Sequence, residues 1–175
     1  MERVGIEGIV LNLLDNSPVL ILKSKKGKVL PIAIGIFEAQ SILIALEKAS
    51  FARPLTHDLI KNIINSFSAG FIRTEIHSIK GGVYYANLVV RKNGKIEKID
   101  CRPSDAIAVA LRFNGEIFVE ENLMEEAEIV KNGKDIKFFK TGGIDRPIDT
   151  KEAEEFRKEI ENMNPGDFWK EIKGK

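Results

Sequence analysis

The sequence predicts an α+β fold in which a mostly antiparallel sheet packs against two or three buried helices. Short turn signals separate most of the apolar strand segments, so hairpins outnumber the strand–helix–strand units of a parallel sheet. One helix has only apolar side chains over 106–111 and must therefore be buried at the centre of the domain. Few apolar residues follow Val130, so we divide the chain into a domain over 1–130 and a charged, partly helical appendage over 131–175.

The strands are expected in two groups of three. Turn signals at 15–18 and 25–27 divide the first group into an antiparallel meander. Gly81-Gly82 and Asn93-Gly94 are hairpin signals that divide the second group. The expected strands cover 4–14, 19–22, 29–34, 71–79, 83–91 and 95–101, and a short further strand covers 116–119.

Two of the expected helices begin at an Arg-Pro pair. Pro103 suits the first position of a helix, because its missing N–H costs nothing there and its φ is already helical. Arg53-Pro54 gives the same signal earlier in the chain, so the two helix starts could face each other. The alternative is that both are ordinary helix entries. The expected helices cover 36–48, 54–68, 103–113, 122–127 and, in the appendage, 151–163.

Composition and charge argue against several classes of protein. The net charge of +1 argues against a strongly basic nucleic-acid-binding protein and against a protein that binds anionic membranes. The longest apolar run, 30–46, is interrupted by Pro31 and Glu38 and is too short to span a bilayer. The lone Cys101 excludes an intrachain disulfide. A lone cysteine suits a reducing compartment, and the N-terminus shows no signal-peptide pattern. Together these two features predict a cytoplasmic protein.

Three sequence blocks and the ending over 155–168 carry a resemblance to a known family. The blocks are LPIAIGIFEA at 30–39, RPLTHDL at 53–59 and DCRPSDAIA at 100–108. In order and separation they resemble the bifunctional nuclease (BFN) domain family over nearly the whole chain. Ala33 stands where an aromatic residue is common in that family, and Cys101 where Ala or Ser is common. The resemblance implies a nuclease that hydrolyses phosphodiester bonds of DNA and RNA.

Acidic residues within these blocks are candidate ligands of a divalent metal, which supplies much of the catalysis in many nucleases. Mg²⁺ usually takes one or two protein carboxylates and keeps several waters. We therefore predict a Mg²⁺ site, although the spacing of the acids matches no dedicated metal motif. The alternative is that Asp58 and Asp105 only stabilise helix N-termini. The candidate ligands are Glu38, Asp58, Asp100 and Asp105.

The other candidate site residues lie at the same two helix starts. His57 is a candidate general base because imidazole titrates near neutral pH, and Asp58 and Asp105 are candidate catalytic carboxylates. Arg53 and Arg102 are candidate phosphate-binding residues, since a guanidinium binds phosphate through two hydrogen bonds. Alternatively, His57 forms a structural hydrogen bond and the arginines pair with the aspartates.

Two functions of different class follow from this. The first is a metal-assisted nuclease whose Asp58 and Asp105 line one cleft. The second is a non-catalytic oligomeric interaction or regulatory protein whose acids and arginines hold subunits together. Carboxylates around an open cleft would favour the nuclease, and Arg–Asp pairs closed across an interface would favour the second function. Either way we predict a homo-oligomer, because the helices and meander carry more apolar surface than a small single sheet needs.

Overall fold

The structure of the protein is a computed structural model that describes residues 1–12, 17–124 and 136–137. These residues belong to one compact unit, Met1–Phe139. The predicted appendage over 131–175, with its charged helix over 151–163, therefore lies outside the described residues except for Ile136–Lys137.

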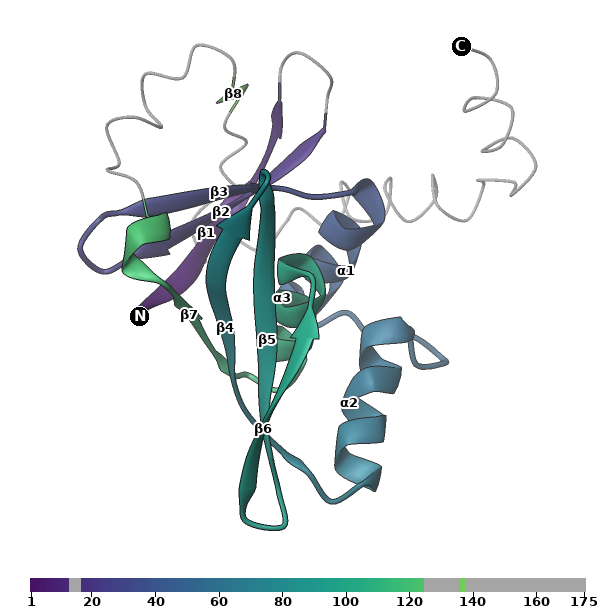
Figure 1. Ribbon diagram of the computed structural model, residues 1–175. Helices are drawn as coiled ribbons and strands as arrows, with labels where there is room; N and C mark the ends of the chain where they lie inside the picture. Colours follow the sequence, from purple (N-terminus) through teal and green to yellow (C-terminus); the bar gives the residue numbers. More distant parts are fainter. Residues whose placement is uncertain (13–16, 125–135, 138–175) are drawn as a thin grey trace. The chain divides into compact units, whose positions relative to one another are not determined.

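One sheet runs through the unit, in the order β3-β2-β1-β7-β4-β5-β6, with β8 pairing to β1 (Figure 1). The two predicted groups of three strands are both present and antiparallel. The short strand β7 joins them, pairing antiparallel with β1 and parallel with β4. The α+β prediction is thus confirmed. The strands are β1 (Glu2–Asn12), β2 (Pro18–Ser24), β3 (Val29–Ala33), β4 (Gly70–Lys80), β5 (Val83–Lys92), β6 (Lys95–Cys101), β7 (Glu116–Val119) and β8 (Ile136–Lys137).

The helices are α1 (Ile36–Leu46), α2 (Thr56–Ser66) and α3 (Pro103–Arg112). Helix α3 begins as predicted, with Arg102 as the N-cap and Pro103 as its first residue. Helix α2 does not begin at Pro54, because Leu55 has extended backbone and its N–H donates to Asp58 Oδ2 at 3.0 Å. The helix predicted over 122–127 is a single 3₁₀ turn at Glu121–Leu123, and residues beyond Met124 lie outside the description.

Helix α3 is the centre of the core. Its residues from Ala106 to Ala110 have no solvent exposure, because α1, α2 and strands β4 and β5 all pack against it. Buried Thr74 of β4 donates its hydroxyl to the Ala106 carbonyl at 2.9 Å, which satisfies both polar groups. Side chains near the starts of α1 and α2 bond to the start of α3, and polar residues gather there. In the part of the chain described here, no helix has the length and apolar character needed to cross a membrane.

Candidate functional site

Arg102 gathers two carboxylates at the start of α3. Its Nε and Nη2 donate to the two oxygens of Asp105, at 2.7 and 3.1 Å. Its Nη1 donates to Glu38 Oε1, in the first turn of α1, at 2.7 Å. The Arg102 side chain is 66% exposed, whereas those of Glu38 and Asp105 are 20% and 25% exposed. The guanidinium is therefore the accessible part of this cluster.

His57 joins the second helix start to the same cluster. Its Nε2 lies 3.1 Å from Asp105 Oδ1, and its Nδ1 lies 2.7 Å from the hydroxyl of Ser41 on α1. The two Arg-Pro helix starts thus do meet, through the second residue of α2 and the third of α3. We call the connected side chains the Asp105 network. Its members are Glu38, Ser41, His57, Arg102 and Asp105.

The charge of Asp105 determines how the protons are arranged in this network. Burial raises the pKa of Asp105, but Arg102 and His57 outweigh burial and hold it below its ordinary value. The hydrogen bonds and charge of Asp105 in turn raise the pKa of Arg102. An ionised carboxylate only accepts hydrogen bonds, so His57 Nε2 carries a proton and donates it to Asp105. In neutral His57 the Nδ1 atom is then an acceptor, and Ser41 donates its hydroxyl proton to it.

Asp58 does not belong to the Asp105 network. Its Oδ1 accepts from Arg112 Nε at 2.5 Å, at the end of α3, and its Oδ2 accepts from the Leu55 N–H. Burial raises the pKa of Asp58, but the Leu55 N–H and the Arg112 guanidinium outweigh it, so the pKa is lowered. Arg112, with a side chain only 5% exposed, also donates to the carbonyls of Ala108 and Ser41. Asp58 thus joins the start of α2 to the end of α3.

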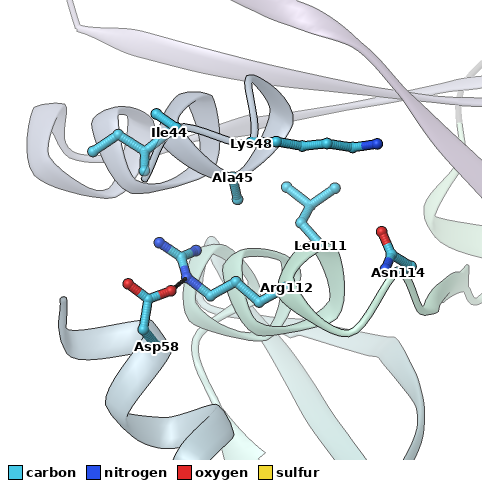
Figure 2. Close-up of a pocket in the computed structure, with 8 residues that line it drawn as sticks. Ile44, Ala45, Lys48, Asp58, Leu111, Arg112 and Asn114 are labelled. Atoms are coloured by element: carbon cyan, nitrogen blue, oxygen red, sulfur yellow. Dashed lines mark hydrogen bonds and ion pairs between the residues drawn. The ribbon is translucent and has the colours of Figure 1, made fainter. Parts of the chain in front are cut away.

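A pocket of roughly 300 Å³ adjoins this second ion pair. In Figure 2 the Asp58 carboxylate and the Arg112 guanidinium face each other from α2 and α3 at one side of it. Arg112 Nη2 is buried, and none of the residues that the structure describes forms a hydrogen bond with it. Seven residues separate Asp105 from Arg112, about 10 Å along a helix, so the pocket lies toward the other end of α3 from the Asp105 network. Its lining residues are Ile44, Ala45, Lys48, Ala49, Asp58, Leu111, Arg112 and Asn114.

The candidate metal ligands lie in three places. Glu38 and Asp105 share Arg102, Asp58 binds Arg112, and Asp100 is exposed on β6. Among the residues described, no three His, Cys, Asp or Glu side chains come together closely enough to hold a metal ion. Glu38 and Asp105, which share Arg102, are the two candidate ligands that lie together, and the metal stays a prediction. Arg53, the second candidate phosphate-binding residue, is exposed in the segment between α1 and α2.

Comparison with known proteins gives the chain its family. The family model of the bifunctional nuclease domain matches residues 20–132, more than half of the sequence. The chain belongs to the bifunctional nuclease domain family. This confirms the resemblance carried by the three sequence blocks. Proteins MT1877 and Rv1829, from two strains of Mycobacterium tuberculosis, are each 32% identical to it over 169 residues. The match covers 96% of this chain and 98% of theirs, and both are described as uncharacterized.

Two residues of the site in this bifunctional nuclease domain were absent from the sequence-based candidates. Ser41 lies one turn after Glu38, so the two share a face of α1, and this spacing was the available signal. Arg112 is the single charged residue in the last turn of α3, after the apolar run 106–111, and a cation there suits the helix dipole. A buried charge at that place requires a partner, and Asp58 provides it.

Replacing Asp58 with Asn is expected to lower the free energy of unfolding by about 2 kcal/mol. Removing one partner of a fully buried ion pair costs roughly 3–5 kcal/mol. The Asp58 side chain is 37% exposed, so solvent screening reduces that cost. Urea denaturation at neutral pH measures the change, and Asp100→Asn on exposed β6 is the matched control. Equal stability of the two variants would contradict the structural role of Asp58.

The stability of the bifunctional nuclease domain is expected to fall in acid. Asp58 and Asp105 have lowered pKa values in the folded state, so both stabilise it above the ordinary aspartate pKa and lose that contribution as pH falls. Glu75, which is buried and paired with Arg73 and Lys98, has a lowered pKa and acts in the same direction. We expect the Tm of the wild-type protein to decrease below about pH 4. The Tm of Asp58→Asn should fall less steeply with pH than that of the wild type. A Tm that rises on acidification would contradict this assignment.

Proposed function

We propose that this protein is a nuclease that hydrolyses phosphodiester bonds of DNA and RNA at the Asp105 network. Membership of the bifunctional nuclease domain family supports the reaction class. The observation that carries the location is His57, held between Asp105 and Ser41 beside the exposed guanidinium of Arg102. A base, a group that orients it and a phosphate-binding cation are thus within one set of contacts.

Arg102 is the residue in this network suited to bind the substrate phosphate. Arginine has five N–H donors, and three of them are used by Asp105 and Glu38. The other two belong to a side chain that is 66% exposed, so they can donate to two phosphate oxygens. Asp105 and Glu38 fix the plane of the guanidinium, which reduces the entropy lost when phosphate binds.

His57 is the proton acceptor in the proposed reaction. Its Nδ1 takes the proton of the attacking oxygen, and the resulting imidazolium is stabilised by the Asp105 carboxylate on Nε2. The ring is only 12% exposed, so its orientation is fixed by the surrounding helices. The same proton can later pass to the leaving oxygen, which needs it as the P–O bond breaks.

The charge of the network gives a reason to include a divalent metal in the test. Two carboxylates share one guanidinium, so Arg102 alone does not offset the charge of an approaching phosphate. The predicted Mg²⁺ would supply positive charge at the phosphate when bound. Glu38 and Asp105 would hold it through the carboxylate lone pairs that Arg102 and His57 leave open.

The proposal is tested by cleavage of single-stranded DNA and RNA with the purified full-length protein, in Mg²⁺ and in EDTA. His57→Gln is expected to lose activity by about 100-fold or more, as is typical when a general base is removed. His77→Gln is the matched control, because His77 lies on β4 and bonds only to Ser78 among the described residues. Equal activity of the His57 variant and the wild type would place the activity elsewhere or in a contaminant.

A second candidate function is that of a non-catalytic interaction protein. One observation favours it: large apolar side chains are exposed along α1, α2 and the segment between them. The wild-type protein would then cleave neither substrate while melting cooperatively. The exposed side chains are Ile36, Phe37, Leu46, Phe51, Leu59, Ile63 and Phe67.

Self-association is expected under either function, because those apolar side chains cost free energy while they face water. Light scattering should give a mass above the 19.6 kDa of one chain. Phe37→Ser and Ile63→Ser, at two exposed positions, are expected to shift the mass toward that of the monomer. A monomer at every concentration of the wild-type protein would contradict the prediction.

A further inference from the structure

The Ser41 hydroxyl is placed as a nucleophile that His57 could activate. Its hydroxyl lies 2.7 Å from His57 Nδ1, and His57 Nε2 lies 3.1 Å from Asp105 Oδ1. A hydroxyl, an imidazole and a carboxylate connected in this order form the arrangement by which a base activates serine and an acid orients the base. The three residues come from three different helices, α1, α2 and α3.

The hydrogen-bond directions agree with that arrangement. Asp105 is charged beside Arg102 and only accepts, so the His57 Nε2–H points to it and the lone pair of Nδ1 points to Ser41. Ser41 therefore donates its proton toward the atom that would remove it.

The neighbours of Ser41 hold it in place while leaving it partly exposed. Its carbonyl accepts from Arg112 Nη1 at 3.3 Å, and Glu38 one turn earlier is bonded to Arg102. Helix α1 is thus anchored to α3 on both sides of the hydroxyl. Ser41 itself is half-buried, and His57 and Asp105 connect its hydroxyl to the exposed guanidinium of Arg102.

We propose that Ser41 Oγ, and not water, is the oxygen that first attacks phosphorus and displaces the leaving group in this protein. In the first step the Oγ–P bond forms, the serine proton moves to His57 Nδ1, and the P–O bond to the leaving nucleoside oxygen breaks as that oxygen takes the proton. In the second step water attacks the phosphoseryl group and gives its proton to His57. The P–Oγ bond then breaks, Ser41 regains a proton and the phosphate monoester leaves. The substrate class, a phosphodiester, rests on the proposed function.

A fluorophosphonate tests the nucleophile without any nucleic acid. This reagent phosphonylates an activated serine and releases fluoride, and intact-mass and peptide mass spectrometry locate the adduct on the full-length protein. We expect one adduct at Ser41, none in Ser41→Ala, and labelling at least about 100-fold slower in His57→Gln. Thermal melts of both variants show whether they are folded. The variant Ser41→Cys retains a nucleophile, and its reaction with an iodoacetamide should depend on His57.

The chain contains a matched control for this experiment. Ser78 Oγ lies 3.1 Å from Nδ1 of the neighbouring His77, but no carboxylate among the described residues bonds to that ring. Ser78 should therefore stay unlabelled under conditions that label Ser41. Labelling of Ser78 and Ser41 at the same rate, or no adduct at Ser41, would overturn the proposal.

The two proposals fail in different ways. An adduct at Ser41 that depends on His57, in a protein that cleaves neither DNA nor RNA, supports the nucleophile and overturns the proposed function. Cleavage that depends on His57, in a protein whose Ser41 stays unlabelled and whose Ser41→Ala variant keeps full activity, supports the proposed function and overturns the nucleophile.

Discussion

Asp105→Asn is expected to reduce nuclease activity by on the order of 100-fold or more. The amide cannot offer two negative oxygens, so it neither holds the His57 Nε2–H in place nor stabilises the imidazolium. It also loses the two-bond pairing with Arg102, whose guanidinium is then no longer held in its plane. Initial rates on single-stranded DNA and RNA measure the effect.

The stability of Asp105→Asn is expected to change little, which separates a catalytic role from a structural one. Arg102 is largely exposed, and a pair of that kind contributes about 0–1 kcal/mol. Glu97→Gln likewise replaces a carboxylate with its amide, at an exposed position on β6 that has no proposed role, and should retain full activity. Full activity of Asp105→Asn would end the case for this site. A marked loss of stability would instead assign Asp105 a structural role.

Val109→Asp is expected to lower the free energy of unfolding by more than about 3 kcal/mol. Val109 has no solvent exposure and lies in the middle of α3, so the new carboxylate would be buried without a partner. Val83→Asp is the matched control, since Val83 is 59% exposed at the start of β5. Urea denaturation of both variants measures the difference. Similar midpoints would show that α3 is not the centre of the core.

Much of the fold could be predicted because its signals are local. Gly81-Gly82 and Asn93-Gly94 end strands wherever the rest of the chain lies, and both pairs have positive φ in the structure. The apolar run in α3 predicted its burial for the same reason. The place of β7 between β1 and β4 could not be predicted, because a four-residue strand with a parallel partner has no local pairing signal. The predicted start of α2 at Pro54 was wrong, because the Leu55 N–H bonds to the Asp58 side chain and Leu55 is the N-cap.

The site was predictable only in part. His57, Arg102 and Asp105 are in contact, as their place at two similar helix starts suggested. Ser41 was not among the candidates because a serine among apolar residues of a helix looks like an ordinary surface position. Asp58 and Asp105 are both the third residue of their helices, yet Asp58 faces Arg112. Which partner a carboxylate finds depends on how the helices cross, and the sequence spacing does not contain that information.

The bond between Arg102 and Glu38 has a consequence for how the protein folds. Helix α1 continues from β3 and α3 continues from β6, and these strands are the two ends of the sheet order. The bond therefore joins residues 64 positions apart whose helices leave opposite ends of the sheet order. Long-range contacts of this kind form slowly, because a large loop must close before any of them is gained. Reactivity of the Asp105 network should accordingly appear last during refolding and disappear together with the sheet during heating, which makes it a reporter of global folding.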